Sequence, residues 1–171
     1  NAHARFAPAS TLKTLTALTL IPRLDPKSSA IPTFEDVNVD GTRVGLVEHV
    51  RYPIPQLFTA MLVVSGNDAA DTLATRAGGI PQTVSAMNAE AQRISAFDTH
   101  AATPSGLDAP GQISSPYDLA LIARAAMALP DFARYVATKH SSILGPQGRI
   151  AISSHDKLLY NYPGAIGIKN G

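Results

Sequence analysis

Hydrophobic residues recur at helical spacing through most of the first three quarters of the chain. Apolar side chains three and four positions apart form one stripe on a helix, and Pro or Gly residues separate the stripes. Pro22 ends the first stripe, and Ser115 and Pro116 provide an N-cap and a first-turn proline for a later one. The sequence predicts helices at about 10–20, 54–64, 69–77, 81–94 and 116–128, with a short helix after Pro130.

Strand-like patterns lie on either side of these helices. Residues 37–44 indicate two short strands around the turn Asp40-Gly41, and Gly145–Gly148 is a second predicted turn. Pro and Gly residues make 96–114 a predicted long loop. The later predicted strands are 141–144, 149–153 and 165–169. The pattern indicates a mixed α/β (α+β type) chain whose helices pack on a sheet from its later part.

Composition narrows the class of protein. The chain has 171 residues, of which 45% are hydrophobic and 16% are charged, with a net charge of +1. This length suits one domain, 1–171, and without a Lys/Arg block we expect no nucleic-acid partner. No apolar run reaches the roughly 18–20 residues of a membrane helix, and the absence of Cys excludes disulfides and thiolate metal sites. The abrupt start at Asn1 and the end at Gly171 predict a trimmed piece of a longer protein.

The tetrad Ser10-Thr11-Leu12-Lys13 is the first candidate for chemistry. Positions three apart share a helix face, so the Lys13 ammonium can reach the Ser10 hydroxyl and, with a lowered pKa, act as its base. The motif alone is weak, because chance gives about 0.4 matches in a chain of this composition. The second match, Ser154-His155-Asp156-Lys157, is interpreted as a chance one, since it lies among predicted strands and turns.

Two further motifs stand downstream. Ser65-Gly66-Asn67 lies between two predicted helices, where a tight turn points both side chains into a cleft. Ser65 could then relay a proton, and the Asn67 amide could hold a substrate amide. Lys169-Asn170-Gly171 ends a predicted strand, where Lys169 could bind a carboxylate and Gly171 lets a substrate approach. Each motif also has a structural reading, as an ordinary helix–helix turn and a charged strand end.

The remaining polar residues are given structural interpretations. Asp68 and Asp71 are interpreted as first-turn acids of the helix after Asn67, and Glu35, Asp36 and Asp40 as a solvated loop. The apolar stripe 119–127 is predicted to be core, and the loop 96–114 to have a structural role. The five His residues show no metal-ligand spacing, and a catalytic His155-Asp156 pair is disfavoured.

Together the three motifs occur in the order known for penicillin-binding proteins and class A β-lactamases. Over nearly the whole chain, the amino-acid sequence resembles the serine-type D-alanyl-D-alanine carboxypeptidases. These belong to the low-molecular-mass penicillin-binding proteins (serine peptidase family S11). The segments that carry this resemblance are Pro8–Lys13, Leu62–Ala70, Met87–Ala89, Asp98–His100, Ser105–Asp108, Ser115–Ala120 and Pro163–Gly171.

The resemblance implies a transpeptidase-like fold, with a mostly antiparallel sheet covered by helices and a helical lobe beside it, incomplete at both chain ends. It implies removal of the terminal D-alanine from peptidoglycan stem peptides in the bacterial cell envelope, without metal or cofactor, through an acyl-enzyme that β-lactams also form. Membrane association would come only from segments outside this chain. By position, Ser10 is the nucleophile, Lys13 its base and Ser65 a proton relay, while Asn67, Lys169, Asn170 and Gly171 bind substrate.

Two departures and two alternatives qualify this expectation. The family usually has Thr at the position of Asn170, so substrate preference or β-lactam affinity is expected to differ. The family's second oxyanion-hole N–H lies just past the position of Gly171, so the isolated chain is expected to be a poor enzyme. A class A β-lactamase is disfavoured because Glu90, the only Glu after Asn67, lies in a predicted helix. A non-catalytic peptidoglycan-binding homologue would leave Ser10 unreactive.

Overall fold

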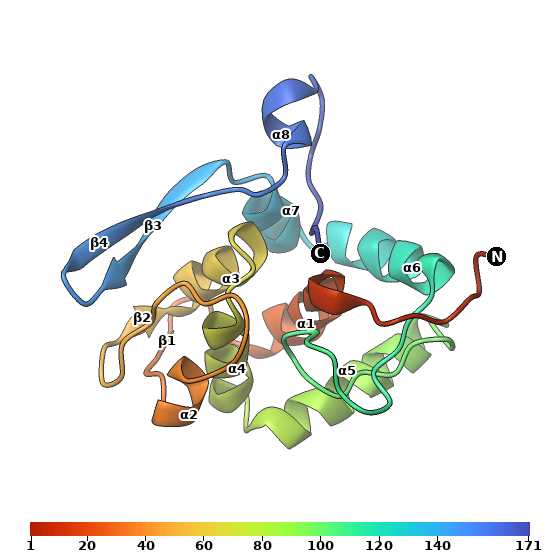
Figure 1. Ribbon diagram of the computed structural model, residues 1–171, viewed down its shortest axis with the longest axis horizontal. Helices are drawn as coiled ribbons and strands as arrows, with labels where there is room; N and C mark the ends of the chain where they lie inside the picture. The colour runs from red at the N-terminus through yellow and green to blue at the C-terminus, as the bar shows by residue number, and fades with distance from the viewer.

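Helix α1 (Lys13–Leu20) runs through the centre of the molecule, and other helices surround it (Figure 1). In the computed structural model, which describes residues 1–171, all eight residues of α1 are buried. Helices α3, α4, α5 and α6 pack against it. The threonines of such a buried helix need partners, and Thr16 Oγ1 donates to the carbonyl of Pro104 at 2.7 Å. The core helix therefore fixes the position of Ser10 and Lys13 at its N-terminal end.

The predicted helices form, with boundaries within about two residues of those expected. Ser115 caps α6 by accepting from Asp118 N, as its sequence pattern predicts. The apolar stripe of α6 supplies Ile122 and Ala126 to the core, where both are fully buried. The helical elements are η1 (Ala9–Leu12), η2 (Ile21–Arg23), α2 (Phe34–Val37), α3 (Ile54–Val63), α4 (Asn67–Arg76), α5 (Ile80–Arg93), α6 (Pro116–Met127), α7 (Pro130–Val136) and α8 (Leu158–Asn161).

The strands form two small antiparallel sheets. Strands β1 (Ser29–Ala30) and β2 (Tyr52–Pro53) make one pair, and β3 (His140–Gly145) and β4 (Gly148–Ser153) make the predicted hairpin. The hairpin extends away from the helices (Figure 1). On one of its faces, Ile143 and Ile152 are buried. The expected α+β class is confirmed, with helices dominant over the sheet within this chain.

The prediction of two strands at 37–44 is wrong. Thr33 and Asp36 form a capping box that starts helix α2 instead, with Thr33 Oγ1 accepting from Asp36 N and Asp36 accepting from Thr33 N. The loop that follows gives its backbone hydrogen bonds to α4, because the carboxylate of Asp68 accepts from the N–H groups of residues 44–46. A buried side chain therefore takes the place of a partner strand.

The strand predicted at 165–169 is also absent. The segment from Tyr162 to Gly171 makes one backbone hydrogen bond of its own, from Ala165 N to Tyr162 O, and pairs with no strand. It is held by packing, with Ile168 against the core and Gly167 over Val136. The chain end then lies beside the start of the central helix (Figure 1).

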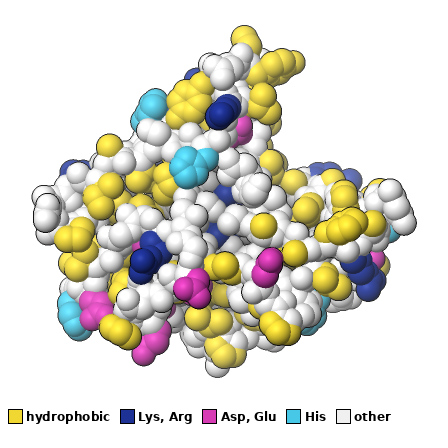
Figure 2. Space-filling view, in the orientation of Figure 1, with side chains coloured by type: hydrophobic (Ala, Val, Ile, Leu, Met, Phe, Trp, Pro, Cys, Tyr) yellow, Lys and Arg dark blue, Asp and Glu magenta, His cyan; other side chains and the backbone are white.

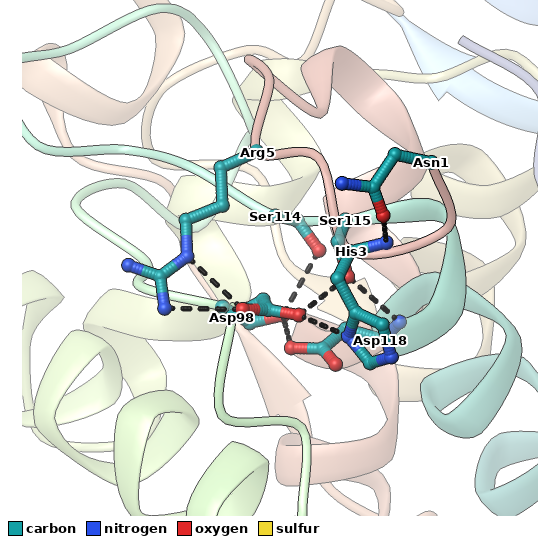
Figure 3. A network of polar contacts seen from close by, with 8 residues as sticks. Asn1, His3, Arg5, Asp98, Ser114, Ser115 and Asp118 are labelled. Carbon is teal, nitrogen blue, oxygen red and sulfur yellow. Dashed lines mark hydrogen bonds and ion pairs between the residues drawn. The ribbon is translucent and has the colours of Figure 1, made fainter.

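The N-terminal segment is fastened by a polar network around Asp98 (Figure 3). Asp98 accepts from Arg5 Nε at 3.0 Å and from Ser115 Oγ at 3.2 Å, and it contacts His3 Nδ1 at 2.7 Å. Phe6 and Ser114 exchange two backbone hydrogen bonds of 2.9 Å. The chain leading to Ser10 is thereby attached to the loop and cap before α6.

None of the helices combines the length and the hydropathy that a membrane-spanning helix needs.

Candidate active site

Ser10 lies in the turn that leads into the central helix. The helix expected from about residue 10 is confirmed, but its first turn, η1, is a 3₁₀ turn, and the α-helix proper starts at Lys13. The turn places Lys13 Nζ 3.0 Å from Ser10 Oγ, as the spacing of three predicts. The preceding residue, Ala9, has a left-handed backbone with φ 50°. Such strain in a non-glycine residue concentrates at functional sites.

Lys13 is fully buried and its ammonium group has three partners. Besides Ser10 Oγ, Nζ donates to Asn67 Oδ1 at 2.6 Å and to the carbonyl oxygen of Ser105 at 2.5 Å. These two carbonyl-type oxygens only accept hydrogen bonds. In the neutral amine they therefore hold both N–H groups and leave the lone pair facing the hydroxyl of Ser10. The geometry suits a general base.

The Ser105 carbonyl was missed in the sequence, because a backbone oxygen carries no residue-type signal. Its loop, 96–114, forms as predicted, but it contributes to the site as well as to the structure. Gly106 permits this approach, since it has φ 80° and a Cβ there would lie 2.2 Å from the carbonyl oxygen of Ala9. Only glycine fits, so the Ser-Gly pair is the one local signal that the loop passes close to Ser10.

The tight turn between α3 and α4 is confirmed, but its two side chains differ in position. Asn67 faces Lys13, and its Nδ2 donates to the carbonyl of Asp40 at 2.7 Å, which fixes the orientation of the amide. Ser65 has φ 64°, is 7% exposed, and its Oγ has no hydrogen-bond partner. Ser65 therefore does not contact Lys13 here. A buried hydroxyl without a partner is rare and calls for a ligand or a rearrangement.

Lys169 reaches the same site from the other end of the chain. Its side chain is buried, and Nζ donates to the carbonyl oxygen of Asn170 and to Asn170 Oδ1. Gly171 lies against the first turn of the central helix, where a Cβ would be 2.9 Å from Thr11 N and 3.4 Å from Ser10 N. The motif Lys169-Asn170-Gly171 thus lies beside Ser10 although it is not a strand, and Asn170 itself is exposed.

Two buried lysines lie in this site, and the charge of Lys169 affects the ionisation of Lys13. Burial lowers the pKa of Lys13 to about 7, and the positive charge of Lys169 acts in the same direction, while Asp71 and Asp68 oppose it. Burial also lowers the pKa of Lys169 to about 8. A sizeable fraction of Lys13 is therefore the free amine at neutral pH, as a base requires.

Two of the three acids near this site, Asp36 and Asp71, differ from their sequence interpretation, whereas Asp68 lies in the first turn of α4 as predicted. Asp36 is buried rather than solvated, unlike its exposed neighbours Glu35 and Asp40. Asp68 is buried and organises the loop 44–46, as described above. Asp71 lies beyond the first turn of α4, and its Oδ1 is buried without a partner. Burial raises the pKa of Asp71 to about 7, with a further contribution from Asp36.

A cavity of about 290 Å³ opens at Ser10 and Asn67, with Gly41, Thr42, Leu107 and Asp108 among its other walls. In the space-filling view, Lys or Arg atoms are seen deep in a hollow at the centre of this face (Figure 2). The second sequence match, Ser154 and Lys157, makes no such arrangement, because Ser154 Oγ accepts from Asp156 N and Lys157 is exposed. The side chains of His155 and Asp156 likewise make no hydrogen bond to each other, and Asp156 Oδ1 accepts from Leu158 N instead.

Comparison with known proteins identifies the family of the chain. The whole chain, residues 1–171, matches the family described as D-alanyl-D-alanine carboxypeptidase, peptidase S11. It is 45% identical over 166 residues to D-alanyl-D-alanine carboxypeptidase DacB2 of Mycobacterium tuberculosis, covering 96% of this chain and 57% of that protein. The chain therefore spans little more than half the length of this curated relative.

Solved structures agree with the sequence match. The crystal structure of a D-alanyl-D-alanine carboxypeptidase from Mycobacterium tuberculosis superposes with a TM-score of 0.96 at 43% identity, over all of this chain and 66% of that one. The Streptomyces K15 DD-transpeptidase superposes with a TM-score of 0.90 at 26% identity, over 99% of this chain and 72% of that one. The expected transpeptidase-like fold is confirmed, and the chain belongs to the D-alanyl-D-alanine carboxypeptidase family, peptidase S11.

Proposed function

We propose that the protein is a serine-type D-Ala-D-Ala carboxypeptidase that removes the terminal D-alanine from peptidoglycan stem peptides. The observation that carries this proposal is the position of Lys13, which is 3.0 Å from Ser10 Oγ, while two accept-only oxygens hold its other N–H groups. Lys169 beside it provides a buried cation for the carboxylate at the end of the peptide. Family membership adds the substrate class.

In the proposed acylation, the amine of Lys13 takes the proton of Ser10, and Oγ attacks the carbonyl carbon between the two D-alanines. The C–N bond breaks as the leaving amine receives a proton from the Lys13 ammonium. D-alanine departs and the peptide stays bound to Ser10 as an ester. Water then cleaves the ester, returns the proton to Ser10 and releases the shortened peptide.

Ser65 and Asn67 have supporting roles in this proposal. The unpartnered hydroxyl of Ser65 is available to carry the proton from Lys13 to the leaving amine, once substrate brings the two within reach. One N–H of the Asn67 amide is used on Asp40, and the second is left for the carbonyl of a substrate amide. The N–H of Ser10, in the first turn of a helix, faces developing negative charge on the attacked carbonyl.

The substrate and the location follow from the same assignment. A D-Ala-D-Ala end has a free carboxylate, which matches the cation of Lys169, and Asn170 and Gly171 border the place where it would lie. Because peptidoglycan lies outside the cytoplasmic membrane, we infer an extracytoplasmic protein that β-lactams inhibit covalently. Asn170, whose amide both donates and accepts, is proposed to contact the same carboxylate.

Mass spectrometry of the full-length protein after incubation with a penicillin tests the proposal. We expect a mass increase of one penicillin that maps to Ser10, is lost in Ser10→Ala and persists in Ser154→Ala, the serine of the chance motif. D-alanine release from an acyl-tripeptide ending in D-Ala-D-Ala is expected from the same protein. Absence of the Ser10 adduct would mean a non-catalytic binding protein, and release of hydrolysed penicillin at many turnovers per second would mean a β-lactamase.

A further inference from the structure

Asp71 is a partly buried acid that the proposed reaction does not use. Its Oδ1 is inaccessible to solvent and has no hydrogen-bond partner, whereas the other two acids around α4 are fully engaged. Asp68 accepts from the backbone of residues 44–46, and Asp36 accepts from Thr33 N and Thr75 Oγ1. A buried carboxylate oxygen left without a donor is costly and calls for an explanation.

The position of Asp71 on α4 relates it to the base. Asn67, Asp71 and Thr75 are spaced four residues apart, so they lie one above the other on one face of the helix. Asn67 binds Lys13 at one end of this row, and Thr75 binds Asp36 at the other. Asp71 therefore stands between the cationic base and a second carboxylate, one helical turn from each bonded side chain.

A second cavity gives Asp71 access to solvent. It has a volume of about 380 Å³, and its walls include Asp71 and Ser105, the residue whose carbonyl holds Lys13. Leu107 and Asp108 border both this cavity and the one at Ser10. Protons can thus reach Asp71 through this second cavity.

Lys13 and Asp71 interact through their charges and not through a hydrogen bond. All three donors of Lys13 are used on other atoms, so Asp71 does not pair with it directly. The charged groups that act on Lys13 are Lys169 from the C-terminal segment and Asp68 and Asp71 from α4. Those that act on Asp71 are Asp36, Lys13 and Asp68, and Glu35, Asp40 and Asp108 share its cavity.

We propose that Asp71 is a positioning residue that acts through Lys13: its charge, held on the face of α4 behind the base, sets the pH range in which Ser10 can be acylated. The proposal rests on the proposed function, in which Lys13 is the base. An ionised Asp71 favours the proton on Lys13 and so withholds the free amine. A neutral Asp71 does not, and the burial that raises the pKa of Asp71 to about 7 keeps a fraction of it neutral where the enzyme works.

The test is the pH dependence of acylation. Asp71→Asn removes the charge with little change of shape, so Lys13 loses its proton at lower pH. The acid limb of the pH–rate profile, where acylation rises as Lys13 deprotonates, therefore moves to lower pH. The rise in rate, relative to the plateau, is expected near pH 7 and within about twofold, because at pH 6 a carboxyl with a pKa of about 7 is mostly neutral already in the unmodified protein. Asp71→Glu, which keeps the charge, is expected to move the limb less. Asp131→Asn, a half-exposed acid of α7 paired with Arg134, is the matched control and should leave the limb in place.

A measurement without substrate separates this inference from the proposed function. The chain has five lysines, so a ¹³C-lysine NMR titration can follow Lys13, with exposed Lys27 and Lys157 as internal references. We expect the Lys13 midpoint to fall in Asp71→Asn and to stay unchanged in Asp131→Asn. An unchanged or raised midpoint in Asp71→Asn overturns the role of Asp71, whether or not Ser10 is acylated. Failure of penicillin to acylate the unmodified protein overturns the proposed function alone.

Folding of the variant is checked by its melting temperature. A carboxyl whose pKa is raised in the folded state destabilises the protein increasingly as pH rises above the unfolded value. Asp71→Asn removes that penalty, so at pH 8 it is expected to melt at or above the temperature of the unmodified protein.

Discussion

The two parts of the molecule that meet at Ser10 are built differently. The helical part, up to α7, surrounds a central helix whose eight residues are all buried, and it supplies Lys13, Asn67 and the Ser105 carbonyl. The C-terminal part is a protruding hairpin, the short helix α8 and a final segment without regular structure, in which Tyr162 and Ile166 are 66% and 62% exposed. Segments with few buried contacts open more readily than a core. The difference indicates that the acylating groups are preorganised, whereas the proposed carboxylate-binding groups depend on a few contacts.

The two parts also act in opposite directions on the base. Asp71 and Asp68 of α4 favour the proton on Lys13, and Lys169 of the C-terminal segment disfavours it. The pKa of Lys13 therefore depends on whether the C-terminal segment holds Lys169 in the site. Three variants can break or sharpen this comparison.

The largest effect is expected from removing Lys13, the proposed base, in the helical part. Lys13→Met keeps an unbranched side chain in the buried site but has no lone pair to accept the proton of Ser10. Acylation by a penicillin should fall about 10²–10⁴-fold, the usual contribution of a general base. Lys157→Met, in the second Ser-x-x-Lys match, is the control and should leave the rate unchanged. A loss of less than about tenfold for Lys13→Met would point to another base.

A smaller effect is expected from the C-terminal part. Lys169→Met removes the proposed partner of the substrate carboxylate, worth about 1.5–3 kcal/mol, so kcat/KM for a peptide ending in D-Ala-D-Ala should fall about tenfold to a hundredfold. It also removes a positive charge beside Lys13, which raises the pKa of Lys13 from its value of about 7. The acid limb of acylation should therefore move to higher pH, opposite to Asp71→Asn.

The control for this variant is Lys27→Met, at an exposed position. Its pH profile and kcat/KM should match those of the unmodified protein. A limb that moved to lower pH in Lys169→Met would show that Lys169 does not face Lys13 in solution.

The smallest effect compares how tightly the two parts are packed. Gly106 and Gly148 both have positive φ, but a Cβ at Gly106 meets the carbonyl oxygen of Ala9 at 2.2 Å, and a Cβ at Gly148 meets nothing within 4 Å. Gly148→Ala should cost only the backbone strain of about 1–2 kcal/mol. Gly106→Ala adds the clash, so thermal unfolding should show a clearly larger drop in melting temperature. Equal drops would mean that the loop 96–114 can move away from Ser10 at no cost.

Local patterns were enough to predict most of the helical part. Helical periodicity, Pro22 and the Ser115 cap give α1 and α6 within a few residues, because these signals act within one or two turns. The spacing of three between Ser10 and Lys13 likewise predicts their contact of 3.0 Å. The capping box of Thr33 and Asp36 is also a local signal, and the interpretation of Asp36 as part of a solvated loop missed it.

Long-range contacts account for what local patterns could not predict. The strands expected at 37–44 do not form, and Asp68, more than twenty residues away, accepts from the N–H of Val44 and of the two residues after it. The strand expected at 165–169 fails because a strand requires a partner, and the segment pairs with none in this chain. In the site, Asn67 and Lys169 were predicted as binding residues, but the Ser105 carbonyl and the unpartnered Asp71 were not.

The sequence by itself determined the residue types of the chemistry, the helix that carries Ser10 and Lys13, and, through its motifs, the family. Only the tertiary structure decided which atoms surround Lys13 and how strongly that lysine holds its proton. The physical reason is that a pKa depends on burial and on charges brought together from distant segments. Lys169, 156 positions after Lys13, and Asp71, on another helix, act on Lys13 only once the chain has folded around the central helix.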